Sequence, residues 1–377
     1  MCRPSFGEEE CEAVRDCLMS GWVSTGPRVQ AFGEALQDYF GGRHVLPVGS
    51  NTAGMYVALK ALGVGPGDEV ITTPLTFTAT ANVIEVVGAN PVLCDVDPHT
   101  RNIDLQDVAS KITPRTRVIL PVHFAGLPVS LKGLEALGKE HHVRIIEDAA
   151  HALGTSDQGQ LVGSTGDIQV FSFHANKNLA TGEGGCIVTG DDALFEQLKP
   201  LHFHGLDRLA WDRFQKKGKS TYDVVVAALK FNMTDMQGAL GLCQIKKFPA
   251  LQEKRRRLAQ RYLEALADVD GLILPEDHKG HAWHLFSPLL CLETLRVDRE
   301  AFVEALKQHN VGASVHYQAL HLFSYYRQKY HYKEGDFPHA EAIAASTVSL
   351  PLFPDLTFED QDRVVEVVKK LVKELRR

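Results

Sequence analysis

A lysine in a polar loop is the residue of this 377-residue chain whose surroundings most suggest covalent chemistry. Lys177 follows an apolar run at 168–172 and precedes the glycine-rich run 182–185. No amphipathic helix pattern surrounds it, and a lysine amine that is desolvated in such a loop loses basicity and becomes a nucleophile. The loop taken alone is explained more simply by a surface lysine that pairs with Glu183.

A second polar cluster contains a carboxylate at the end of an apolar run. The segment 147–151 reads Glu-Asp-Ala-Ala-His and comes directly after the run 144–146. Burying the Asp148 carboxylate at the end of a strand costs free energy unless a partner needs its charge. The alternative is that Asp148 caps a following helix, with His151 an ordinary histidine of that helix.

A third cluster of small polar residues opens a predicted helix. The segment 49–54 reads Gly-Ser-Asn-Thr-Ala-Gly after the run 45–48, and free N–H groups at a helix start bind phosphate or carboxylate. An ordinary N-cap explains this segment more simply when it is taken alone. Together, however, the three clusters suit pyridoxal phosphate: a phosphate at 50–52, Asp148 keeping the ring nitrogen protonated, and Lys177 forming a Schiff base.

Alternating strands and helices are predicted to position these clusters. Strands are expected at 45–48, 68–72, 91–95, 117–122, 143–146, 168–172 and 186–189, and helices at 52–62, 78–87, 104–112 and 131–140. Continuous β-branched runs separated by helices are typical of a mostly parallel sheet that is covered on both faces. Ligands of such α/β sheets bind at the carboxyl ends of the strands, where all three clusters lie.

The C-terminal third is predicted to form a smaller α+β domain. A helix expected at 249–267 carries the chain out of the sheet domain, and further elements are expected as a strand at 284–290, a helix at 299–308, a strand at 312–316 and a helix at 361–375. The sequence thus predicts a large domain over 1–248 and a small domain over 249–377.

Composition and charge exclude several classes of protein. The chain has 44% hydrophobic and 23% charged residues and a net charge of -7, which indicates a globular protein and argues against a nucleic-acid partner held by phosphate charge. No apolar run reaches the roughly 18 residues of a membrane span, and no signal-peptide pattern is visible. The seven cysteines form no C-x-x-C pair or zinc spacing, so we expect reduced thiols, no metal site and a cytoplasmic location.

These motifs resemble those of the DegT/DnrJ/StrS family of nucleotide-sugar aminotransferases, which are built on the fold-type I scaffold of pyridoxal phosphate enzymes. The likeness covers essentially the whole chain and is most specific at 147–151 and in the lysine loop 171–185. It also includes the segments 20–27, 65–71 and 121–126. Some relatives carry histidine at the position of Lys177 and act as dehydratases, so lysine here favours transamination.

The resemblance implies a role for each residue around the coenzyme ring. Lys177 would form the Schiff base and shuttle a proton, Asp148 would pair with the ring nitrogen, and His151 would lie near the phenolic oxygen. Phe77 matches the aromatic residue that stacks on the ring.

The resemblance also implies which residues contact the phosphate and the substrate. Three residues match the phosphate cup: Thr52, Ala53 and Ser172. A neighbouring subunit of a homodimer would add a further contact from the segment 228–235, where this chain departs from the usual motif and offers either Lys230 or Asn232. Thr25 and His316 are expected near the substrate.

Among family members, the likeness is greatest to enzymes that act on the UDP-4-keto-pentose of the aminoarabinose pathway. It rests on the segments 204–206, 281–286, 315–317 and 350–354. The chain departs from those enzymes at 216–219, a Lys-Lys-Gly-Lys run that is interpreted as a solvated loop or a diphosphate contact.

The expected activity is transfer of an amino group, with glutamate as donor, to a 4-keto nucleotide sugar. A 3-keto substrate and a non-catalytic ligand sensor on the same fold remain alternatives. A dinucleotide-dependent oxidoreductase is disfavoured because no G-x-G-x-x-G follows the first strand.

Overall fold

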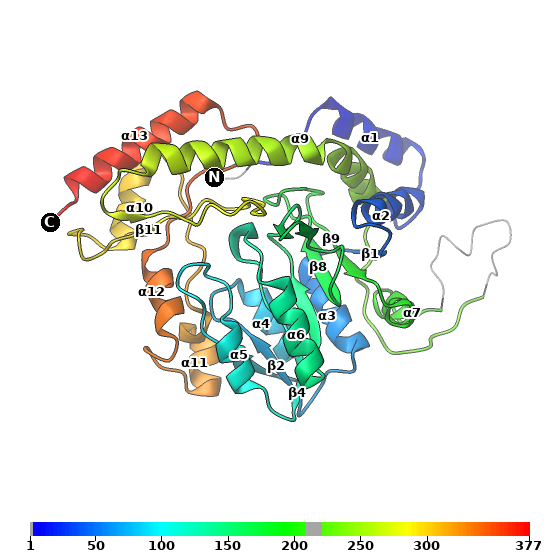
Figure 1. The fold of residues 1–377 in the computed structure, drawn as a ribbon. Helices are drawn as coiled ribbons and strands as arrows, with labels where there is room; N and C mark the ends of the chain where they lie inside the picture. Colours follow the sequence, from blue (N-terminus) through cyan, green and yellow to red (C-terminus); the bar gives the residue numbers. More distant parts are fainter. Residues whose placement is uncertain (1–2, 208–220) are drawn as a thin grey trace.

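One seven-stranded sheet forms the centre of the computed structural model, which describes residues 3–207 and 221–377 (Figure 1). Its order is β1-β9-β8-β5-β4-β2-β3. The strands are β1 (His44–Val48), β2 (Glu69–Thr72), β3 (Asn90–Leu93), β4 (Thr116–Ile119), β5 (Arg144–Asp148), β8 (Ile168–Ser172) and β9 (Gly185–Thr189). Strand β9 runs opposite to the other six strands of this sheet. The predicted mostly parallel sheet is confirmed.

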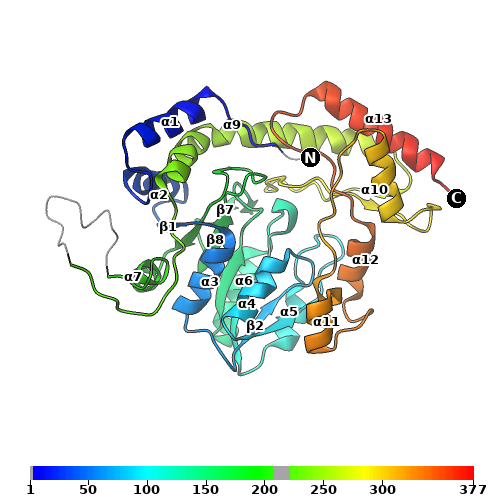
Figure 2. The same cartoon turned by 180° about the vertical axis from the view of Figure 1, so that it is seen from behind.

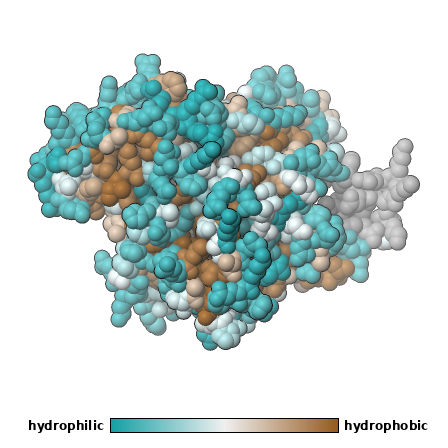
Figure 3. Space-filling view, in the orientation of Figure 1, coloured by the Kyte–Doolittle hydropathy of each residue, from teal (hydrophilic) through white to brown (hydrophobic). Residues whose placement is uncertain are grey.

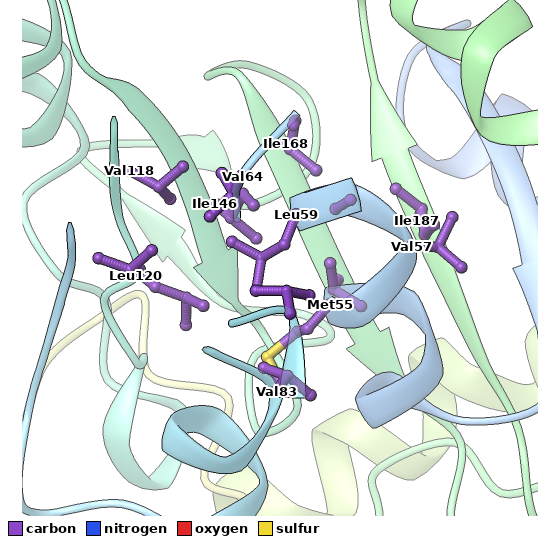
Figure 4. Close-up of a cluster of buried hydrophobic side chains, with 14 of the residues drawn as sticks. Met55, Val57, Leu59, Val64, Val83, Val118, Leu120, Ile146, Ile168 and Ile187 are labelled. Carbon is purple, nitrogen blue, oxygen red and sulfur yellow. The ribbon is translucent and has the colours of Figure 1, made fainter. Parts of the chain in front are cut away.

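Helices cover both faces of the sheet, because successive strand residues point to opposite faces. On one face, Met55 and Leu59 of α3 (Asn51–Ala61) pack against Val118 and Ile146 (Figure 4). Val83 of α4 (Thr78–Val86) joins the same cluster. Truncating one such buried side chain to alanine costs about 2–5 kcal/mol.

The strand residues next in sequence face the other layer. Ile119 and Ile145 pack with Val108 of α5 (Leu105–Lys111) and Leu134 of α6 (Leu131–His141). This alternation explains why the strands read as continuous apolar runs: each is buried on both sides.

A 32-residue helix, α9 (Asp235–Leu266), crosses the top of the molecule as seen in Figure 1. The helices α1 (Glu8–Met19) and α2 (Pro27–Tyr39) pack against its first half, and α13 (Phe358–Glu374) packs against its second half. The view from behind in Figure 2 shows the same arrangement.

The structure corrects the predicted start of this helix. It begins at Asp235, where Thr234 forms a capping box with Gln237, and not at Pro249, which lies inside it. Proline is favoured in the first turn of a helix, so the sequence suggested a start where the helix in fact continues. The predicted domain boundary between residues 248 and 249 therefore falls within one continuous helix, and the two-domain division stays a prediction.

The strands predicted in the C-terminal part are mostly absent from the described residues. Of the run 284–290, only β11 (Leu289–Leu290) forms a strand, and it pairs with β10 (Leu272–Ile273). The run 312–316 contributes a single bridge between Ser314 and Ser349. The run 284–290 is mostly buried and the run 312–316 is half-buried, and neither has, among the described residues, a neighbouring strand long enough to form a ladder.

The remaining elements complete the C-terminal part and the strand connections. They are α7 (Asp192–Leu201), α10 (Arg299–Gln308), α11 (Ser324–Tyr330), α12 (Pro338–Ser346), the short 3-10 helices η1 (Phe124–Gly126) and η2 (Leu320–Leu322), and the hairpin of β6 (Ser156–Asp157) and β7 (Gln160–Leu161). Polar residues interspersed with separate apolar patches cover the face seen in Figure 3. Within residues 3–207 and 221–377, no helix has the length and apolarity to cross a membrane.

Candidate active site

The predicted clusters meet in one cavity at the carboxyl ends of the central strands. It has a volume of about 570 Å³. Seven residues singled out from the sequence line it: Thr52, Phe77, Asp148, His151, Ser172, Lys177 and His316. They come from five separate segments of the chain, so only the fold brings them together.

Asp148 is buried at the end of β5 and accepts hydrogen bonds from uncharged groups. Its Oδ1 accepts from Asn51 Nδ2 at 3.1 Å and from the Ala150 N–H at 3.2 Å, and its Oδ2 accepts from Thr80 Oγ1 at 2.8 Å. Burial raises the pKa of the carboxyl group, and these donors together with the charge of Lys177 oppose that shift. The carboxylate is thus held in place for a cationic partner.

The structure rejects the alternative in which Asp148 caps a helix. Residues 149–155 form turns, and no helix begins there. His151 is consequently not a helix residue: it lies in these turns and is 5% exposed.

His151 is neutral and held in one tautomer. Its Nδ1 accepts a hydrogen bond from the Ala125 N–H at 3.2 Å, so the ring proton lies on Nε2, which donates to the hydroxyl of Tyr317 at 3.0 Å. Burial, together with the charge of Lys177, lowers the pKa of His151 well below its usual value. The hydroxyl of Tyr317 is left with its own proton to donate, and Tyr317 also lines the cavity.

The lysine loop leaves the sheet at the end of β8 and returns as β9. The Lys177 N–H donates to the His174 carbonyl at 2.9 Å, and the Ala175 N–H donates to the Gly182 carbonyl at 2.9 Å. These bonds close the loop beside the cavity, so the half-buried Lys177 comes to lie near Asp148.

Glycine is required where the loop rejoins the sheet. A Cβ atom at Gly185 would lie 2.6 Å from the Phe171 carbonyl oxygen and 2.7 Å from the Asn51 nitrogen. The backbone of β9 therefore passes directly against the first turn of α3. This close approach fixes the N-terminus of α3 at the cavity.

The first turn of α3 offers hydrogen-bond donors to an anion. Ser50 caps the helix and accepts from the Ala53 N–H at 3.1 Å, while the exposed Thr52 lines the cavity. Ala53 itself is 8% exposed and does not line the cavity. Phe77, at the N-cap of α4, also lines the cavity and is 60% exposed.

The other three predicted residues lie outside this cavity. Thr25 Oγ1 donates to the Met233 carbonyl at 2.5 Å, and Asn232 Nδ2 donates to Thr25 Oγ1 at 2.5 Å. Lys230 is exposed and lies two residues away on the same segment, which bridges to Phe203. The run 216–219, interpreted as a solvated loop or a diphosphate contact, lies outside the described residues.

A family model described as the DegT/DnrJ/EryC1/StrS aminotransferase family matches residues 4–369. The chain belongs to this family. It is 43% identical over 373 residues to the spore coat polysaccharide biosynthesis protein SpsC of Bacillus subtilis, covering 98% of this chain and 96% of SpsC.

Solved structures of similar proteins have the same fold. Helicobacter pylori PseC, an aminotransferase involved in the biosynthesis of pseudoaminic acid, is 30% identical with a TM-score of 0.91, covering 99% of this chain and 98% of PseC. Spr1654 from Streptococcus pneumoniae in its PLP form is 30% identical with a TM-score of 0.91, covering 100% and 99%. The aminotransferase described here thus has the fold-type I architecture and uses pyridoxal phosphate.

The residues present fit this coenzyme. A protonated ring nitrogen would supply the cation that the buried Asp148 carboxylate lacks among its hydrogen-bond donors. Thr52 and the first turn of α3 would hold the phosphate, and Lys177 would hold the aldehyde carbon. All three lie on one cavity wide enough for the ring.

Sequence reasoning missed three residues that complete the site. Asn51 and Thr80 donate to Asp148, and Tyr317 binds His151. Asn51 lay within the segment recognised as a helix start, and Tyr317 follows the predicted His316. Their specific contacts depend on which strands are neighbours, and no local pattern contains that information.

Proposed function

We propose that this enzyme moves an amino group from an amino acid, with glutamate as the donor, to the 4-keto group of a nucleotide-linked sugar. The observation that carries the proposal is the convergence of Lys177, Asp148 and His151 on one cavity. The sugar is supported by the printed roles of SpsC in polysaccharide biosynthesis and PseC in pseudoaminic acid biosynthesis. The 4-keto position is supported by the resemblance of segments 204–206, 281–286, 315–317 and 350–354 to the aminoarabinose enzymes.

Lys177 is the residue that transfers the proton in the proposed reaction. Pyridoxal phosphate, when bound, supplies an electron sink for the carbon that loses its proton. The Lys177 amine would take the proton from the substrate carbon as a general base and would give it, as a general acid, to C4′ of the coenzyme, the carbon on the other side of the transferred nitrogen. Asp148 keeps the ring nitrogen protonated, which makes the sink effective.

The neutral side chains of His151 and Tyr317 orient the ring without adding charge. His151 Nε2–H donates a hydrogen bond to the Tyr317 oxygen, so the O–H of Tyr317 can donate to an oxygen in the cavity. Phe77 offers an exposed ring face for stacking. Ser172 and Thr52 add hydroxyl groups at the phosphate end.

The functional unit is proposed to be a homodimer. The segment 222–229 exposes a row of apolar side chains: Tyr222 53%, Val224 58%, Val225 58%, Val226 38% and Leu229 58%. Such a patch indicates a protein partner, and this segment leads directly to Lys230 and Asn232, one of which is expected to contact the coenzyme phosphate bound in the other subunit. Leu229→Glu should convert a dimer into monomers in sedimentation, with Ile273→Glu, 54% exposed elsewhere, as the matched control.

The substrate is tested by product analysis. The purified enzyme is incubated with pyridoxal phosphate, L-glutamate and a panel of UDP- and dTDP-linked 3-keto and 4-keto sugars, and the products are identified by NMR. We expect an axial or equatorial amine at C4 of one sugar. A C3 amine would replace the 4-keto assignment, and no turnover of any sugar would refute the proposed function.

A further inference from the structure

A second cavity adjoins the coenzyme cavity. It has a volume of about 160 Å³ and shares two wall residues, Asn176 and His316, with the larger cavity. His284, Ser314 and Ser349 add three more polar side chains to its wall. A cavity of about 150 Å³ is large enough for one six-membered ring.

A chain of buried amides fixes the proton of His284. Gln252 Nε2 donates to the Ala282 carbonyl at 2.7 Å, so its Oε1 is the acceptor for Asn178 Nδ2 at 3.2 Å. Asn178 Nδ2 also donates to the Ala282 carbonyl at 3.0 Å, which leaves Asn178 Oδ1 as an acceptor. The partner of that oxygen is His284 Nδ1 at 3.2 Å, which must therefore carry the ring proton.

The remaining ring nitrogen of His284, Nε2, thus has a lone pair and accepts hydrogen bonds. Burial lowers the pKa of His284 well below its usual value, so the ring stays neutral. His151 lies beside it, with ring centroids 4.3 Å apart, and has the opposite tautomer. Tyr317 thus offers a hydrogen-bond donor to the coenzyme cavity. His284 lines the second cavity, and its acceptor Nε2 is the ring nitrogen that Asn178 leaves available to a ligand there.

The second cavity suits a neutral ligand with hydroxyl groups. Among the described residues that line it, none is charged at neutral pH, because burial lowers the pKa of His316 to about 4. A carboxylate ligand would need a cation or several N–H donors. Hydroxyl groups both donate and accept, and they match an imidazole lone pair together with the hydroxyls of Ser314 and Ser349.

We propose that this second cavity binds the ring of the sugar substrate and that His284 accepts a hydrogen bond from one ring hydroxyl. The proposal rests on the sugar aminotransferase function proposed above. Asn178 and Gln252 act as positioning residues, since they reach the ligand only through the tautomer of His284. Because His284 Nε2 can only accept a hydrogen bond, the enzyme should select for sugars that carry a hydroxyl group at one particular ring position.

Two variants of His284 separate this role from a structural one. His284→Asn keeps an N–H group near the position of Nδ1 but has no atom at the position of Nε2, whereas His284→Gln keeps an acceptor there. The glutamate half-reaction and the sugar half-reaction are measured separately by coenzyme absorbance, with whichever keto sugar of the panel supports turnover. The ratio of the two kcat/KM values is compared between variants.

We expect the sugar half-reaction of His284→Asn to fall about tenfold relative to its glutamate half-reaction, and His284→Gln to keep most of it. An unchanged ratio in His284→Asn would overturn the subsite while leaving the proposed function intact. If the wild-type enzyme uses no sugar of the panel, the proposed function fails, and the subsite fails with it.

A test in the wild-type enzyme covers the case in which His284→Asn does not fold. Analogues of the productive sugar that lack one ring hydroxyl at a time are compared with the parent sugar. One analogue should lose about tenfold in kcat/KM. Equal use of every analogue would overturn the proposal.

Discussion

The substitution Asp148→Asn removes one charge and almost no volume from the centre of the site. Two N–H groups converge on Oδ1, and the hydroxyl of Thr80 donates to Oδ2. The oxygen of the new amide can keep both N–H donors. Its NH₂ group then faces Thr80 Oγ1, which can turn its proton to the neighbouring Thr76 Oγ1 at 2.8 Å.

The substitution is expected to leave the stability of the apoenzyme almost unchanged and to lower the activity of the holoenzyme. In the apoenzyme, the pKa of Asp148 is raised, so the folded state binds more protons than the unfolded state above the ordinary pKa of 3.8. The free energy of unfolding therefore falls as pH rises from there to the folded-state pKa. The asparagine does not titrate, so the variant does not undergo this fall in stability. Its rearranged hydrogen bonds lower the stability by about 1 kcal/mol. The two effects offset each other, so apo Asp148→Asn should be as stable as the wild-type apoenzyme at pH 7.

Turnover should instead fall about 10- to 1,000-fold. An opposite charge at contact distance shifts a pKa by about 1–3 units, and the coenzyme ring nitrogen loses that shift when the carboxylate becomes an amide. The fraction of coenzyme whose ring nitrogen is protonated then falls about 10- to 1,000-fold, and turnover falls with it because the protonated ring is the effective electron sink. Urea unfolding of the apoenzyme and steady-state kinetics of the holoenzyme measure the two effects.

A matched control removes a neighbour of the carboxylate and keeps its charge. Thr80→Val deletes the donor to Oδ2 and should cost less than about tenfold in turnover, because the ring nitrogen keeps its ionic partner. Near-wild-type turnover in Asp148→Asn would show that the charge is not needed. A loss of more than about 3 kcal/mol in the apoenzyme would show that the carboxylate is a structural group.

Three further substitutions test the site and the fold. Lys177→Ala should abolish turnover while circular dichroism stays unchanged, and the absorbance of lysine-bound coenzyme should disappear; substantial turnover would exclude Lys177 as the proton carrier. Gly185→Ala places a Cβ 2.7 Å from the Asn51 nitrogen and should lower the free energy of unfolding in urea by about 1–3 kcal/mol. As the control, a Cβ at Gly65 would lie 3.9 Å from its nearest neighbouring atom, so Gly65→Ala should be close to neutral. Equal losses of stability in the two variants would contradict the packing argument. Burial lowers the pKa of His202 to about 4, so the unfolded protein binds more protons at this residue than the folded protein does between pH 6.5 and 4. The wild-type enzyme therefore loses stability as the pH falls through that range, and His202→Asn should remove about 3 kcal/mol of this loss. Identical plots of unfolding free energy against pH for the wild type and His202→Asn would refute this.

Much of the chemistry could be read from residue types and local spacing. The lysine loop, the acidic residue after an apolar run and the small polar helix start are each local patterns, and the strands that precede them are marked by continuous β-branched runs. Side chains at strand ends share one edge of a parallel sheet, so the convergence of Lys177, Asp148 and Thr52 followed from the order of elements. Local alternatives, such as Asp148 as a helix cap, could not be rejected at that level.

The sequence by itself determined the strands of the sheet and the helices that cover it, and it predicted which residues bind the coenzyme, because periodicity and residue chemistry act over a few neighbouring positions. Only the tertiary structure decided that α9 continues through Pro249 and that the runs near Leu289 and Ser314 make few strand pairs. It also decided the tautomers of His151 and His284, since their hydrogen-bond partners lie 26 and 106 residues away in the chain. Such contacts arise from packing between distant segments, which no short sequence pattern encodes.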